Sequence, residues 1–249
     1  MLVAVGIFLA VAVGAALQRI SGMGLGLLAA PALSLLVGPV TGVLLINVLA
    51  TINAASNTIA QRADVDWRKF TPIALALAFG AVPGAFVIRA VSPDALMLIV
   101  GVVLIVALSV VTLGKRHVPH VEGVVPAAAS GVAGGFMNTL AGVAGPAITV
   151  YAQAARWEHR TYAATLQPIF LVSGALSFLI KEVTGAADLS AVSPLMWGVS
   201  LVALVVGITA GTYFAPRVPS GPAHKIALGL AFFGGFVALV RGLVGLLGG

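Results

Sequence analysis

The 249-residue chain has no cysteine and few charges: 13 Lys+Arg and 7 Asp+Glu make up 8% of it. The absence of cysteine excludes disulfides, thiolate metal sites and cysteine nucleophiles. Soluble domains carry roughly a quarter charged residues. With 60% hydrophobic residues and a mean hydropathy of +1.14, the chain has too little polar surface to cover a globule in water. We therefore expect an integral membrane protein that is embedded in a lipid bilayer.

Acidic side chains and histidines are missing from the interiors of the apolar segments. A proton relay, a metal cage or a protease dyad within the membrane needs such groups. The sequence therefore predicts no enzyme and no metal or other cofactor. His117 and His120 have metal-like spacing, but no acidic cluster lies near them. The basic residues are scattered singly, so the net charge of +6 indicates membrane topology and no nucleic-acid partner.

Ten apolar segments of about 13 to 25 residues favour an all-α, polytopic transmembrane helical bundle over a barrel. They cover 2–18, 25–37, 40–60, 70–90, 94–113, 122–138, 141–154, 160–180, 192–214 and 222–246. The segments 25–37 and 141–154 are too short to span a hydrocarbon core of roughly 30 Å. Each is therefore expected to be a short broken or re-entrant helix, or part of a V-shaped hairpin.

Basic residues give the expected sidedness. If all ten segments change sides, one face has only Arg89, Lys181 and Arg241, and the other has the remaining basic residues. If the two short segments return to the side they came from, this bias vanishes. The positive-inside rule favours ten changes of side and places both termini outside the cytoplasm. A V-shaped hairpin formed by the first two segments preserves this sidedness.

The two halves of the chain resemble each other weakly. A glycine-rich break precedes a short segment in each half, from Gly22 to Gly26 and from Gly142 to Gly145. The spacings Gly80/Gly84 and Gly207/Gly211 also match, and they are typical of close helix packing. We expect residues 1–118 and 119–249 to be two five-segment repeats of one membrane domain. With five segments each, the repeats are inverted, and broken helices then place a site near the midplane.

The two breaks are candidates for an anion site. Glycine lets the backbone approach a ligand, and the N-terminus of the short helix that follows presents unpaired N–H groups. Polar side chains beside the breaks and in the next long segments add donors, although interhelical packing and hydrogen bonding explain them too. The candidate substrate-binding residues are Arg19, Ser21, Gly22, Gly24, Gly26, Asn47, Asn53, Asn57, Asn138, Thr139, Gly142, Gly145 and Gln167.

At these breaks the chain resembles the TauE/SafE, or sulfite exporter, family. The resemblance rests on the glycine-rich stretches that lead to Pro31 and Pro146, and on the polar loop from Arg62 to Trp67. It implies a secondary transporter of the bacterial inner membrane that exports a small sulfur-containing oxyanion, such as sulfite or an organosulfonate. Two alternatives remain open: ion-coupled uptake of such an anion, and a non-transporting membrane scaffold subunit.

Overall fold

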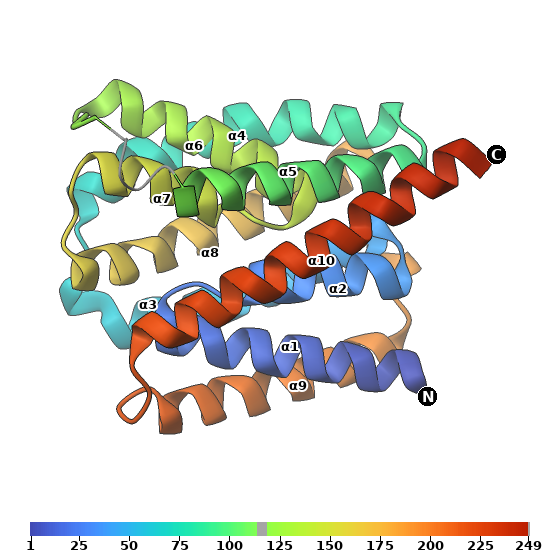
Figure 1. Cartoon of the computed structure of the whole chain (residues 1–249), viewed down its shortest axis with the longest axis horizontal. Helices are drawn as coiled ribbons and strands as arrows, with labels where there is room; N and C mark the ends of the chain where they lie inside the picture. The colour runs from blue at the N-terminus through green and yellow to red at the C-terminus, as the bar shows by residue number, and fades with distance from the viewer. Residues whose placement is uncertain (114–118, 249) are drawn as a thin grey trace.

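The computed structural model describes residues 1–113 and 119–248, and these residues form helices without a strand. His117 and residue 118, where the first predicted repeat ends, lie outside the described residues. The long helices are α1 (Leu2–Ser21), α3 (Pro39–Gln61), α4 (Trp67–Ala90), α5 (Pro93–Leu113), α6 (Val124–Ala141), α8 (His159–Thr184), α9 (Pro194–Phe214) and α10 (Ser220–Gly248). The short ones are α2 (Leu25–Val37), α7 (Gly145–Ala154) and the 3-10 turns η1 (Arg62–Asp64) and η3 (Leu189–Ala191). The predicted helical bundle is confirmed (Figure 1).

Eight helices within the described residues are long and apolar enough to cross a membrane, and α2 and α7 are not among them. Their 13 and 10 residues correspond to about 20 and 15 Å of helix. Local sequence stops both: Gly38 adopts φ 90° before Pro39 begins α3, and Arg156 adopts φ 50° after α7. The short segments are thus confirmed as short helices, and the number of membrane crossings stays a prediction.

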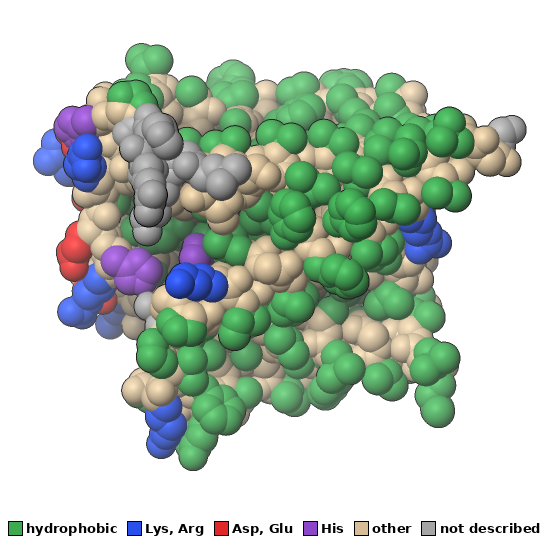
Figure 2. Space-filling view, in the orientation of Figure 1, with side chains coloured by type: hydrophobic (Ala, Val, Ile, Leu, Met, Phe, Trp, Pro, Cys, Tyr) green, Lys and Arg blue, Asp and Glu red, His purple; other side chains and the backbone are tan. Residues whose placement is uncertain are grey.

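Hydrophobic side chains cover the middle of the visible face, and the charged ones gather at its ends (Figure 2). At one end, Arg160 pairs with Asp64 at 2.9 Å and Lys69 lies over the Trp157 ring. Both chain termini lie at the opposite end (Figure 1). Lys181 differs from the other basic residues of this count in that its side chain is buried inside the bundle.

The positions of the termini lead to a topology prediction. A C-terminal fusion to a reporter that is active only in the cytoplasm should be inactive, because the end rich in basic loops is retained inside. The same reporter inserted between Gln61 and Lys69 should be active. A bright C-terminal fusion would contradict the sidedness inferred from the basic residues.

Three helix pairs hold the outer part of the bundle: α1 with α9, α4 with α6, and α5 with α10. A Cβ at Gly207 would collide with the Ala12 carbonyl oxygen, and one at Gly80 would collide with that of Val132. Only glycine allows these backbones to approach so closely. The packing role predicted for these glycines is confirmed. The pairs leave α2, α3, α7 and α8 to form the middle of the bundle.

Candidate functional site

The two glycine-rich breaks meet inside the bundle although they are far apart in sequence. Gly22 (φ 82°) and Gly142 (φ 70°) end α1 and α6 in the left-handed conformation, which favours glycine. Their N–H groups donate to the carbonyls four residues earlier, at 2.9 and 2.8 Å. A Cβ on Gly26 would lie 2.5 Å from the Gly142 carbonyl oxygen. The start of α2 is therefore in direct contact with the break that follows α6.

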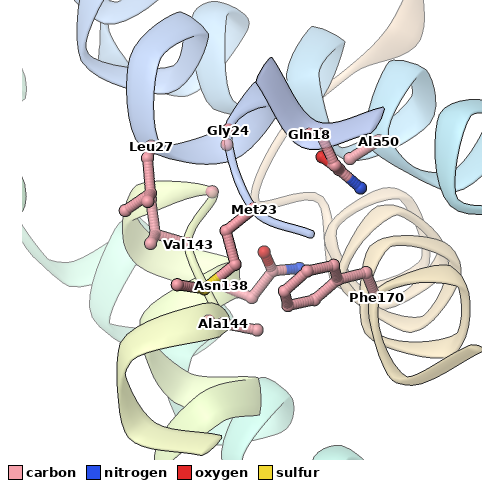
Figure 3. Close-up of a pocket in the computed structure, with 12 residues that line it drawn as sticks. Gln18, Met23, Gly24, Leu27, Ala50, Asn138, Val143, Ala144 and Phe170 are labelled. Atoms are coloured by element: carbon pink, nitrogen blue, oxygen red, sulfur yellow. The ribbon is translucent and has the colours of Figure 1, made fainter. Parts of the chain in front are cut away.

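A small cavity of about 30 Å³ lies between the breaks. It has room for one or two water molecules, since one water needs roughly 10–15 Å³ on this measure. Figure 3 shows the side chains of Met23, Asn138 and Phe170 converging on it. The other lining residues are Gln18, Gly24, Gly26, Leu27, Ala50, Gly142, Val143, Ala144 and Gly145. None of the lining residues is charged, so Gln18 and Asn138 supply the polar side chains.

Hydrogen bonds fix the first break to α8. Gln18 Nε2 donates to Gln167 Oε1 at 3.1 Å, and Gln167 Nε2 donates to the Gly22 carbonyl at 3.0 Å. Gln18 Oε1 accepts from the backbone N–H of Leu25 at 3.3 Å. The first N–H group of α2, expected to be free for an anion, is therefore already occupied by Gln18.

A matching network fixes the second break to α3 and α8. Asn138 Nδ2 donates to Ser177 Oγ at 3.0 Å, and the Thr139 hydroxyl lies 2.9 Å from the same oxygen. Asn47 Nδ2 lies 3.5 Å from the Asn138 carbonyl oxygen and accepts at Oδ1 from Lys181 Nζ at 2.7 Å. A polar cluster with one buried ammonium group thus adjoins the cavity wall.

The model of the sulfite exporter TauE/SafE family matches residues 7–238 of the chain. The chain belongs to the TauE/SafE family. No curated protein and no solved structure matches it significantly. The described helices and this match make the chain a multi-pass membrane protein of a transporter family for sulfur-containing anions.

The residues predicted for the site in this TauE/SafE chain divide into three groups. Those that line the cavity are Gly24, Gly26, Asn138, Gly142 and Gly145. Those that lie behind its walls, in the two networks or at a break, are Gly22, Asn47, Thr139, Gln167 and Ser21. Those that lie toward the end rich in basic loops are Arg19, Asn53 and Asn57, where Arg19 NH1 donates to Asn57 Oδ1 at 2.9 Å.

Ser21, Gly24 and Gly142 have structural roles that the sequence did not reveal. The Ser21 hydroxyl lies 2.8 Å from the Leu17 carbonyl and 2.7 Å from that of Met23, so it closes the break and does not line the cavity. A Cβ at Gly24 would lie 2.6 Å from the Gln18 backbone nitrogen, and one at Gly142 would lie 2.6 Å from Ile46. A side chain at either glycine would therefore disturb packing, and such variants do not test ligand binding.

Sequence reasoning missed Gln18, Lys181 and Ser177 as members of the site. Gln18 stands next to Arg19 in the first break, so its place in the sequence was informative. Lys181 gave no such indication, because a basic residue at the end of an apolar segment is usually a topology determinant.

A second cavity of about 480 Å³ lies beyond Met23 on the side of the basic loops. Its lining carries His159, His224 and Lys225 and no carboxylate. Tyr162 and Thr149 stand between the two cavities: their hydroxyls are 2.7 Å apart, and Thr149 Oγ1 lies 3.5 Å from Met23 Sδ. The larger cavity is thus a basic vestibule, separated from the inner cavity by Met23, Thr149 and Tyr162.

Proposed function

We propose that this protein is a secondary transporter or facilitator of the bacterial inner membrane that exports a small sulfur-containing oxyanion, such as sulfite or an organosulfonate. The anion enters from the end rich in basic loops, where the basic vestibule and Arg19 lie, and passes Met23 to a binding site between the two breaks. The observation that carries the proposal is the meeting of the two breaks at one cavity, with Gln18 and Asn138 in its wall. Membership of the TauE/SafE family supports the class of substrate.

The geometry favours a transporter over a scaffold subunit. In a scaffold, side chains would fill the space between the breaks. Here the breaks enclose a cavity that has room for water and is lined by the amide side chains of Gln18 and Asn138. The cavity is too small for an oxyanion in this conformation, so substrate binding requires Met23 or Phe170 to move. A closed inner site beneath an open vestibule is the arrangement expected of one state in an alternating-access cycle.

The proposal includes two inverted repeats, 1–118 and 119–249. Residues 120 positions apart occupy matching places: Gln18 corresponds to Asn138, and Asn47 to Gln167. The link from α1 to α8 through Gln18 and Gln167 then has its counterpart in the link from α6 to α3 through Asn138 and Asn47. Exchange of the halves also converts the α1–α9 pair into the α6–α4 pair.

The proposed function is tested by ligand-induced stabilisation of the purified full-length protein. Sulfite, sulfate, thiosulfate, sulfoacetate and chloride are added in turn, and the unfolding temperature is measured. A ligand at 100 times its Kd stabilises a folded protein by about 2.7 kcal/mol. We expect sulfite or a sulfonate to raise the unfolding temperature above that in chloride at equal ionic strength. Equal unfolding temperatures in all five anions would contradict the proposed substrate class.

A further inference from the structure

Lys181 is a cation buried in the bundle without an acidic partner. Lys181 lies in the last turn of α8 and is only 1% exposed. Its side chain is among the largest that are fully buried. Its one hydrogen bond goes to Asn47 Oδ1, at 2.7 Å. Among residues 1–113 and 119–248, no carboxylate forms an ion pair with it. Burial of an uncompensated charge is unfavourable by several kcal/mol, so such a residue in a membrane span indicates function.

A polar row on α8 connects the inner cavity to Lys181. Phe170, Ser173, Ser177 and Lys181 are three or four positions apart, which places them along one face of the helix. Phe170 lines the cavity. Ser173 Oγ is buried and has no protein partner, and Ser177 Oγ accepts from Asn138 Nδ2. This row therefore leads from the cavity toward the end of the molecule that holds the termini.

A corresponding row runs along α3 in the opposite direction. Ala50, Asn53 and Asn57 stand 120 positions before Phe170, Ser173 and Ser177. Ala50 lines the cavity, both amide atoms of buried Asn53 lack a protein partner, and Asn57 accepts from Arg19. α3 ends beside the start of α8, where Asp64 pairs with Arg160. Each row thus begins at the cavity and ends at a cation, and the two rows lead to opposite ends of the bundle.

We propose that Lys181 is the anion ligand of the exit half of the pathway, and that Arg19 has the same role in the entry half. The ammonium group binds the oxyanion after it leaves the cavity between the breaks, and Asn47 and Ser177 are the neutral ligands beside it. The proposal rests on the proposed export function and assigns one step of it to a named residue. It also explains why Lys181 has no carboxylate partner: the transported anion compensates its charge.

The test compares Lys181→Met, Lys181→Arg and wild type as full-length proteins in liposomes loaded with sulfite. Lys181→Met should lower sulfite efflux by about tenfold or more, as expected when a hydrogen bond to a charged group is lost. Lys181→Arg keeps the charge and should retain more efflux than Lys181→Met. The matched control is Arg89→Met, which removes an exposed cation and should leave efflux unchanged.

A second measurement separates ligand binding from a structural role. Methionine in place of a buried charge is often neutral or stabilising, so Lys181→Met without ligand should unfold at the wild-type temperature or above. Its stabilisation by sulfite should be smaller than that of wild type. Wild-type efflux in Lys181→Met would overturn the inference. It would also be overturned if Lys181→Met unfolded earlier yet kept the full sulfite effect. Failure of the wild type itself to transport any anion would instead contradict the proposed function.

Discussion

Arg19→Ala is expected to reduce sulfite efflux from liposomes by roughly ten- to a hundredfold, because a hydrogen bond to a charged group contributes about 1.5–3 kcal/mol. Arg19 is the charged side chain of the first break, and its NH1 is held by Asn57 Oδ1 at 2.9 Å. It is partly buried at the end of the polar row on α3, where it can contact both solvent and an entering anion. Loss of the guanidinium removes the attraction that brings the anion onto this row.

Arg19→Lys should retain an intermediate rate. Lysine keeps the positive charge, but its single ammonium group lacks the planar fork that binds Asn57 and an oxyanion at the same time. Arg68→Ala is the control, because this exposed arginine also lies at the basic end. Wild-type efflux in Arg19→Ala would contradict a role for Arg19 in anion binding and leave it only a role in membrane topology.

Efflux is expected to follow an imposed membrane potential without a pH gradient. Movement of one negative charge across 100 mV changes the free energy by about 2.3 kcal/mol, which is close to a fiftyfold change in the equilibrium gradient. The structure offers no carboxylate for proton coupling in the middle of a described span: each acidic residue lies outside the helices or in a first or last turn. They are Asp64, Asp66, Asp94, Glu122, Glu158, Glu182 and Asp188.

The measurement uses liposomes with a potassium gradient and an ionophore at equal pH on both sides. An inside-negative potential should accelerate sulfite efflux, and a pH gradient at zero potential should leave it unchanged once protonation of sulfite itself is allowed for. Flux that tracks the pH gradient alone would overturn this mechanism.

If proton coupling were found, the structure would rank the candidate carriers. Burial tends to raise the pKa of Asp66, but hydrogen bonds from Lys69 and Arg68 and the charge of Lys69 outweigh it and lower that pKa. Asp66 is therefore held ionised and is a poor carrier. Glu158 lies in the loop before α8. Glu182 is partly buried with Oε1 unpaired, next to Lys181 in sequence, and would be the first residue to replace by glutamine.

The amino-acid sequence by itself determined the helical bundle, the limits of its ten helices to within a few residues, and the positions of both breaks. These features depend on local properties. A long apolar run forms a helix in lipid because its backbone groups must bond within the segment. The breaks follow from glycines whose left-handed conformation other residues rarely adopt, as at Gly22 and Gly142.

Only the tertiary structure decided that the two breaks meet, that Gln18 occupies an N–H group of α2, and that Lys181 points inward. The contact between Lys181 and Asn47 joins residues 134 positions apart. A lysine at the end of an apolar segment extends to water unless neighbouring helices cover it and supply an acceptor. Hydropathy and helical periodicity describe one segment at a time, so neither contains the packing of α3 against α8 that makes this lysine part of the site.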